Sequence, residues 1–123
     1  MAANPIVWFE VYVQDMARAR AFYEALLDVK LRPMDMPDIE MWSFPSEQGS
    51  AGAGGALIRM EGVTPGMGGT LVYFNCIDCA VEAKRAAANG GAIFKEKTSI
   101  GAHGFYALVH DSEGNMVGLY SMQ

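Results

Sequence analysis

Glu10 is the side chain whose type and place in the sequence most directly suggest chemistry, because it is a carboxylate inside a strand-like apolar segment. Strand periodicity places Glu10 on the same face as Trp8 and Tyr12. A carboxylate on such a face is costly unless it is solvated, paired or used. It could act as a general base or as a partner for a cationic or hydroxyl-bearing ligand. Alternatively, it makes a structural bond, for example to Tyr73 or Arg59, or faces water.

The other candidate groups are two cysteines and two histidines. Cys76 and Cys79 form a C-x-x-C pair, which supports redox chemistry when it is exposed at a helix N-terminus. Strand periodicity instead places Cys76 on the face of Phe74, which we expect to pack under a helix, so both thiols are predicted to be buried and unreactive. Structural zinc would need two further ligands, and His103 and His110 are the strongest remaining candidates. His103 could be an acid-base group at a rim or a solvent-facing loop residue.

Bulk composition limits the classes of function. The chain has 123 residues and is 51% apolar, which fits a single domain with a substantial core. Its formal charge of −5 argues against a nucleic-acid partner. No segment approaches the roughly 20 apolar residues that span a membrane, and the N-terminus does not resemble a signal peptide. We therefore expect a cytoplasmic protein that binds neither nucleic acid nor membrane.

An internal repeat organises the whole chain. Residues 8–15 and 71–78 each alternate over a strand's length, end in Asp and lead into an Ala-rich helical pattern. Asp15 and Asp78 are the expected N-caps of these helices. The predicted helices cover residues 16–27 and 79–89, and the predicted strands cover about residues 5–13, 29–35, 40–44, 56–61, 71–78, 92–98, 103–110 and 115–121.

This order predicts an α+β fold made of two βαβββ modules in tandem. Module one covers about residues 5–62, a linker covers 63–69 and module two covers about 70–123. The modules are expected to form one curved, cup-like sheet with the helices on its outer face. The glycine-rich loop at 49–55 feeds a strand and lacks a Gly-Lys-Ser/Thr sequence, so we interpret it as a rim or lid and not as a phosphate-binding loop.

Three segments carry a family resemblance: Val13-Gln14-Asp15 at a strand end, Phe22-Tyr23 in the first helix, and the turn at residues 111–115 before the last strand. In this order they resemble the vicinal oxygen chelate superfamily, which contains glyoxalase I, bleomycin-resistance proteins, extradiol dioxygenases and fosfomycin-resistance enzymes. The most similar branch is the glyoxalase-like one, also termed lactoylglutathione lyase-related. The resemblance covers nearly the whole chain and implies a homodimer.

The resemblance also implies where a divalent metal would be held. The first-strand ligands lie seven residues before the Asp that ends each strand, which gives Trp8 and Leu71. The last-strand ligand lies four residues after the turn glycine, which gives Gly118, and its counterpart in module one falls near Ile58. None of these side chains can coordinate such an ion, so we predict no metal and no other cofactor. A register shifted by two residues would bring in Glu10 as one good ligand.

Without a metal, the expected cup is an aromatic pocket with a few polar groups, which is typical of a small-molecule site. Gly118 would leave room for a ligand there. We expect a small organic molecule to bind without catalysis, as in the bleomycin-resistance type. The alternatives are a glyoxalase-like lyase or isomerase with Glu10 as general base, a metal-dependent glyoxalase or dioxygenase if the register is misread, and a degenerate domain that acts through its dimer interface. The residues expected to line the cup are Trp8, Glu10, Tyr12, Ile58, Met60, Leu71, Tyr73, Asn75, Gly118 and Tyr120.

Overall fold

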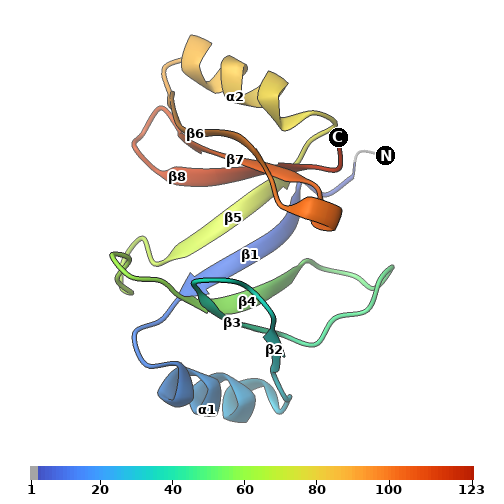
Figure 1. The fold of residues 1–123 in the computed structure, drawn as a ribbon, viewed down its shortest axis with the longest axis vertical. Helices are drawn as coiled ribbons and strands as arrows, with labels where there is room; N and C mark the ends of the chain where they lie inside the picture. Colours follow the sequence, from blue (N-terminus) through green and yellow to red (C-terminus); the bar gives the residue numbers. More distant parts are fainter. Residues whose placement is uncertain (1–2) are drawn as a thin grey trace. The chain divides into compact units, whose positions relative to one another are not determined.

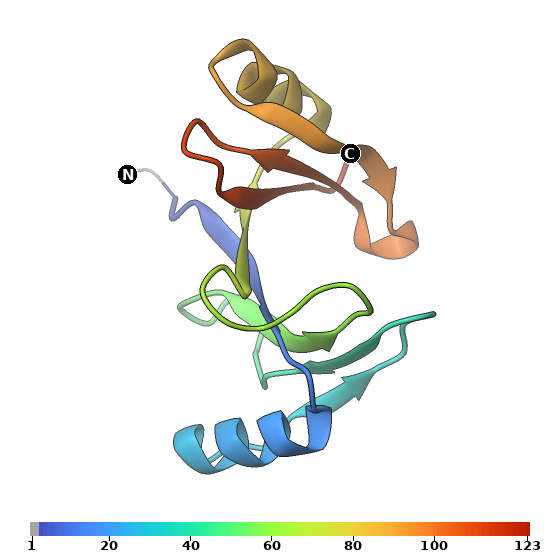
Figure 2. The ribbon, with the colours of Figure 1, turned by 90° about the vertical axis from the view of Figure 1, so that its left-hand side faces the viewer.

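The computed structural model describes residues 3–123, and these form two compact units. One unit spans residues 8–70 and the other consists of residues 3–7 and 71–123. Each unit has a sheet with one long helix against it, as both Figure 1 and Figure 2 show. Within the described residues, no helix is long and apolar enough to cross a membrane.

Module one has the predicted βαβββ order. Its strands are arranged β2-β3-β4-β1, with β1 and β4 parallel and the other neighbours antiparallel. The elements are β1 (Ile6–Tyr12), α1 (Met16–Leu27), β2 (Arg32–Met34), β3 (Glu40–Ser43) and β4 (Gly54–Arg59).

Module two repeats this order. Its strands are arranged β5-β8-β7-β6, with β5 and β8 parallel and the other neighbours antiparallel. A short 3₁₀ turn, η1, includes His103, the first residue of the strand predicted at 103–110. The observed strand β7 therefore starts two residues later than expected. The α+β class and the repeated βαβββ order are therefore confirmed. The elements are β5 (Thr70–Asn75), α2 (Cys79–Ala88), β6 (Ala92–Ser99), η1 (Gly101–His103), β7 (Phe105–His110) and β8 (Met116–Ser121).

Both helices begin at the predicted N-caps. Asp15 Oδ1 accepts a hydrogen bond from the main-chain N–H of Arg18 at 3.0 Å, and Asp78 Oδ1 accepts one from Ala80 at 3.1 Å. These bonds satisfy donors that a helix leaves open at its first turn. Asp78 Oδ1 also receives the Lys97 ammonium at 2.9 Å. The hydrogen bond from Lys97, followed by the one from the Ala80 main chain, holds the pKa of Asp78 below its usual value.

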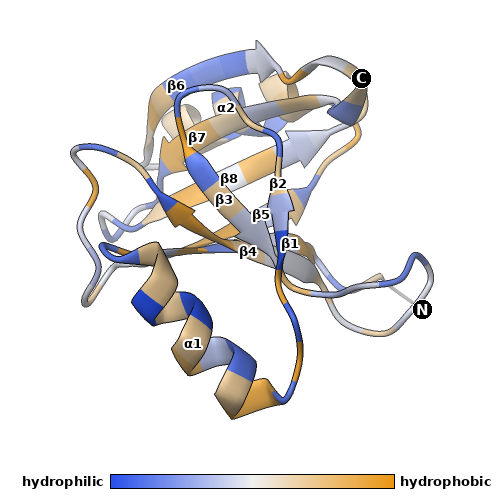
Figure 3. Ribbon diagram, turned by 60° about the horizontal axis from the view of Figure 1, so that its bottom comes forward, coloured by the Kyte–Doolittle hydropathy of each residue, from blue (hydrophilic) through white to orange (hydrophobic). Residues whose placement is uncertain are grey.

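Each helix covers one face of the sheet in its own module. In module one, Val13, Met16, Leu31 and Leu57 are buried between α1 and the strands. In module two, the buried cluster between α2 and its sheet contains Cys79, Ala83, Ala107, Val109 and Leu119. In contrast to these buried clusters, strand β6 at the edge of the module-two sheet is largely hydrophilic (Figure 3). The remaining face of each sheet is therefore the one on which a functional site could form.

Candidate functional site

The face of β1 away from α1 carries the three residues that alternation predicts. Trp8, Glu10 and Tyr12 pair in register with Gly54, Ala56 and Ile58 of β4, so these six residues share one face of the sheet. Continuing across β3, Met41 pairs with Ile58. We call the set Trp8, Glu10, Tyr12, Met41, Ala56 and Ile58 the β1 face.

Trp8 is held at both ends of its indole ring. Its Nε1 donates a hydrogen bond to Glu10 Oε2 at 3.2 Å. Its six-membered ring lies over Gly54, where an added Cβ would come within 3.3 Å of Trp8 Cζ3. Glycine thus lets the ring approach the β4 backbone closely. The result is an aromatic surface whose orientation is fixed by contacts within module one.

Glu10 is a buried carboxylate in apolar surroundings. Only 8% of its surface is exposed, and Ala56 and Ile58 beside it on the β1 face are buried as well. Burial of a carboxylate is costly unless hydrogen bonds compensate it, and the indole of Trp8 supplies one such bond. Arg59 donates through Nε to the Gln14 main-chain oxygen at 3.0 Å, which places this end of its side chain at the end of β1.

The methionine side of the β1 face was not predicted from the sequence. Met41 is buried, and Met34 packs against the same cluster from β2. The signal was present, because Met41 and Ser43 alternate with Trp42 and Phe44, which pack towards α1. Met60, predicted for the cup, lies just after β4 ends at Arg59 and is 37% exposed.

In module two, the corresponding face has different chemistry. Tyr73 pairs with Gly118, and its ring lies directly on the glycine, where an added Cβ would come within 2.8 Å of Tyr73 Cγ and nearer still to Cδ2. The expectation that Gly118 leaves room for a ligand is therefore wrong, because the Tyr73 ring already fills that space. An aromatic ring over a strand glycine is a recurrent way of covering its exposed backbone.

The other predicted residues of module two are spread over this face and its edge. Leu71 is buried at the start of β5, whereas Asn75 at its end is exposed. Tyr120 donates its hydroxyl to the main-chain oxygen of His103 in η1, so this hydroxyl anchors a turn of its own module. The His103 side chain is exposed, as expected for a residue at a rim.

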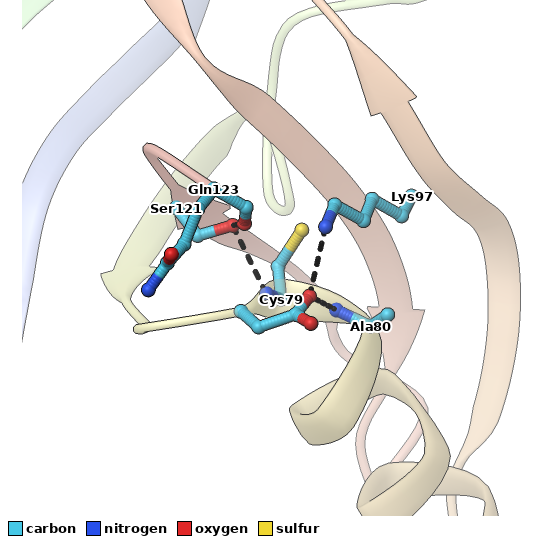
Figure 4. Close-up of polar contacts among 6 residues, drawn as sticks. Cys79, Ala80, Lys97, Ser121 and Gln123 are labelled. Atoms are coloured by element: carbon cyan, nitrogen blue, oxygen red, sulfur yellow. Dashed lines mark hydrogen bonds and ion pairs between the residues drawn. The ribbon is translucent and has the colours of Figure 1, made fainter.

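The two cysteines lie where a reactive pair is not expected. Cys79 is fully buried at the start of α2, and its main-chain N–H donates to Ser121 Oγ at 3.0 Å (Figure 4). Cys76 packs beside Phe74 against the α2 cluster, on the predicted face, but it is half-buried and not fully buried as expected. Burial, followed by the nearby Glu82 carboxylate, raises the pKa of Cys76 to about 11. Its thiol therefore stays protonated at neutral pH and is a poor nucleophile.

Comparisons with known proteins agree with this architecture. A family profile described as "Bleomycin resistance protein-like N-terminal" matches residues 5–43, which cover β1, α1, β2 and β3. No curated protein matches the chain in sequence. The similarity to several solved structures extends over nearly the full length of this chain and of each of those proteins. Methylmalonyl-CoA epimerase from Mycobacterium tuberculosis has a TM-score of 0.69 and 16% identity, over 100% of this chain and 93% of that chain.

Two further structures show the same likeness. A glyoxalase/bleomycin resistance protein/dioxygenase superfamily member from Vibrio splendidus 12B01 has a TM-score of 0.66 and 19% identity, over 96% of this chain and 99% of that chain. A Streptomyces coelicolor methylmalonyl-CoA epimerase variant in complex with 2-nitronate-propionyl-CoA has a TM-score of 0.66 and 14% identity, over 98% of each chain. The chain has the fold of the vicinal oxygen chelate superfamily. The resemblance in fold that the sequence predicts is confirmed.

The positions at which this superfamily would hold a metal carry no suitable donors in this chain. Ile58 and Leu71 are buried and apolar, and Gly118 lies under the Tyr73 ring. By strand register the module-one counterpart of Gly118 is Ala56, two residues before Ile58, and alanine also lacks a donor. Within residues 3–123, no three His, Cys, Asp or Glu side chains gather as a metal site. These residues do not fit the divalent cation of a vicinal oxygen chelate enzyme.

Proposed function

We propose that the protein binds a small organic molecule on the β1 face without a metal, as the bleomycin-resistance type does. The observation that carries this proposal is the pairing of a buried carboxylate, Glu10, with an immobilised indole, Trp8. A structural core gains nothing from a buried carboxylate that an apolar residue of similar volume would not give. The predicted cytoplasmic location and homodimer belong to this proposal.

The chemistry of the face defines the class of ligand. Trp8 offers a flat π-surface for a planar group, and Glu10 offers an acceptor for a cationic or hydroxyl-bearing group beside it. Met34 and Met41 supply polarisable, adaptable side chains that fit irregular apolar surfaces. Two similar structures bear the names of an epimerase and a glyoxalase/bleomycin resistance/dioxygenase protein, so small organic molecules are ligands consistent with this fold.

Fluorescence titration in a Trp42→Phe background tests the proposal, because Trp8 is then the sole indole. Bleomycin and methylmalonyl-CoA serve as probes. We expect a probe that binds the β1 face to quench Trp8 emission. Calorimetry should show about tenfold or greater weakening in Trp8→Ala, from lost stacking worth roughly 1.4 kcal/mol or more. The matched control Trp42→Phe alone should bind normally. Unchanged affinity in Trp8→Ala would contradict the proposal.

A second candidate is an epimerase or isomerase in which Glu10 is the general base. The epimerase names among the similar structures and the burial of Glu10 favour it. Incubation of methylmalonyl-CoA in deuterated water would reveal proton exchange at its acidic carbon by NMR. We expect exchange that persists in EDTA and falls about 100-fold or more in Glu10→Gln. Exchange unaffected by Glu10→Gln would exclude this role for the carboxylate.

A further inference from the structure

A groove lies along one side of module one, between the first two turns of α1 and the linker at residues 63–69. It has a volume of about 490 Å³, which is within the range of small-molecule sites. Every residue that lines it belongs to the compact unit of residues 8–70. Val11 and Val13, which pack towards α1 and away from the β1 face, contribute to its lining. We call this cavity the α1 groove.

The linker side of the α1 groove is built from hydrogen-bonded backbone. The main-chain N–H of Tyr12 donates to the Gly69 oxygen at 2.8 Å, which ties the linker to the end of β1. The N–H of Gly69 donates in turn to the Gly66 oxygen at 2.9 Å and closes a tight turn. A Cβ at position 69 would come within 2.9 Å of the Gly66 backbone, so glycine is what permits this turn. The groove therefore has a defined wall opposite α1.

Two opposite charges line the α1 groove at the N-terminal end of the helix. Asp15 and Arg18 are both exposed, and they lie three positions apart, on one side of the helix. Asp15 Oδ1 accepts the main-chain N–H of Arg18, but neither charged group forms an ion pair within the described residues. The other charged residues of α1, Arg20 and Glu24, pair with each other at 3.8 Å. The charges that α1 leaves unpaired are thus the ones at the groove.

Module two treats its matched N-cap differently. Asp78 corresponds to Asp15, and its carboxylate is paired with the Lys97 ammonium at 2.9 Å. The position that corresponds to Arg18 carries Val81, which has no charge. Module two therefore neutralises its N-cap carboxylate within its own fold. In module one, the corresponding carboxylate and a guanidinium are both left to groups outside the module.

From these contacts we propose that the α1 groove binds a small zwitterion with an apolar tail, of the α-amino-acid type. The ammonium group of the ligand pairs with the Asp15 carboxylate, and its carboxylate receives the Arg18 guanidinium. A ligand with a single charge would be attracted by one of these groups and repelled by the other. The tail lies between Phe22, which is 59% exposed, and Pro65 of the linker. Binding thus covers a large apolar side chain that otherwise faces water.

An NMR titration of the isotope-labelled full chain with L-phenylalanine tests the site. We expect the main-chain amide signals of residues 14–22 and 66–69 to shift, because these segments border the α1 groove. Phenethylamine lacks the carboxylate and hydrocinnamate lacks the ammonium group, so each should bind about tenfold more weakly than L-phenylalanine. Equal affinities for the three probes would overturn the proposal. Shifts centred on β4 would place the probe on the β1 face and would overturn it as well.

Crossing these probes with two variants tests the role of each charge. Arg18→Gln should reduce the affinity for L-phenylalanine to that for phenethylamine, whereas phenethylamine itself binds no more weakly than before. Asp15→Asn keeps a good N-cap and should bind L-phenylalanine no better than hydrocinnamate. Arg32→Gln is the matched control, since Arg32 is exposed on β2 and lies outside the groove. A damaged fold would weaken all three probes alike, whereas the proposal requires selective losses. Equal losses of L-phenylalanine affinity in Arg18→Gln and Arg32→Gln would show that the pairing is wrong.

Discussion

The two modules have the same strand register, but they carry different side chains at one pair of matched positions. In module one, Glu10 of the first strand pairs with Ala56 of the closing strand, whereas in module two Tyr73 pairs with Gly118. The larger ring in module two thus accompanies the smaller partner, and the ring covers the glycine. In module two, the large Tyr73 side chain fills the space that the absent side chain of Gly118 leaves. In module one, the matched position carries the Glu10 carboxylate beside the small Ala56 side chain. The repeat therefore preserves the fold while the side chains at matched positions differ in size and charge.

The cysteines are understood through the same comparison. Aligning the two N-caps, Asp15 and Asp78, places Cys76 at the position of Val13 and Cys79 at that of Met16. Val13 and Met16 belong to the buried cluster under α1, just as Cys79 belongs to the one under α2. Positions filled by Val and Met in one copy are packing positions, so the C-x-x-C spacing follows from the repeat and requires no redox role.

The largest expected effect comes from filling the space under the Tyr73 ring. Gly118→Ala should destabilise the protein by about 1–3 kcal/mol, because its Cβ would overlap Tyr73 near the root of the ring, where rotation gives little relief. Urea denaturation measures the difference in the free energy of unfolding. Ala56→Gly at the matched position of module one should cost less, about 1 kcal/mol, since it removes a methyl group and loosens the strand.

A double-mutant cycle sharpens this comparison. Tyr73→Ala should relieve the overlap, so Gly118→Ala in that background should cost less than in the wild type by about 1 kcal/mol or more. Gly55→Ala is a parallel test in module one, because its Cβ would overlap the Phe9 ring about as closely. Equal costs for Gly118→Ala with and without the Tyr73 ring would show that the close contact is not the cause.

Alternation and capping made the fold predictable from sequence. The repeated strand–Asp–helix pattern indicated both modules and both N-caps, and the strands facing each helix have the expected polarity. The ends of elements were less predictable. Residues 29–31 were predicted to belong to the second strand, but they precede β2, and the Leu31 N–H donates to the Glu24 side chain. In the strand predicted at 103–110, His103 belongs to η1 and Gly104 follows it. Such local hydrogen bonds depend on partners that periodicity does not reveal.

The candidate site was predictable in its faces but not in its contacts. Alternation correctly grouped Trp8, Glu10 and Tyr12, because strand side chains have a period of two residues. It could not show that the Tyr73 ring would occupy the space above Gly118, since that depends on a side-chain rotamer and on register between distant strands. The roles proposed for these residues stay predictions until binding is measured.

A smaller effect is expected from the charge at the N-cap of α2. The pKa of Asp78 is lowered chiefly by its hydrogen bond to Lys97, so its stabilisation is present above the unfolded value of about 3.9 and is lost as pH falls through the folded pKa. Asp78→Asn keeps a good N-cap but removes the titrating carboxylate, so the variant should lose less stability as pH falls through this range. Urea midpoints measured from neutral to acid pH, with Asp15→Asn as the module-one control, check this. Lys97→Met should raise the pKa of Asp78 in an NMR titration; no change would contradict the assignment.

The smallest effect is expected at Cys76, where the two modules differ only in the residue that fills a packing position. Cys76→Val installs the side chain found at the matched position, Val13, and should change the free energy of unfolding by no more than about 0.5 kcal/mol. Because the pKa of Cys76 is raised to about 11, iodoacetamide should modify the folded protein slowly at pH 7.5 and faster as pH rises. Glu82→Gln removes a nearby negative charge that raises this pKa, and should speed the reaction. Rapid alkylation at neutral pH, or clear destabilisation by Cys76→Val, would show that module two uses its thiol in a way that the comparison with Val13 does not explain.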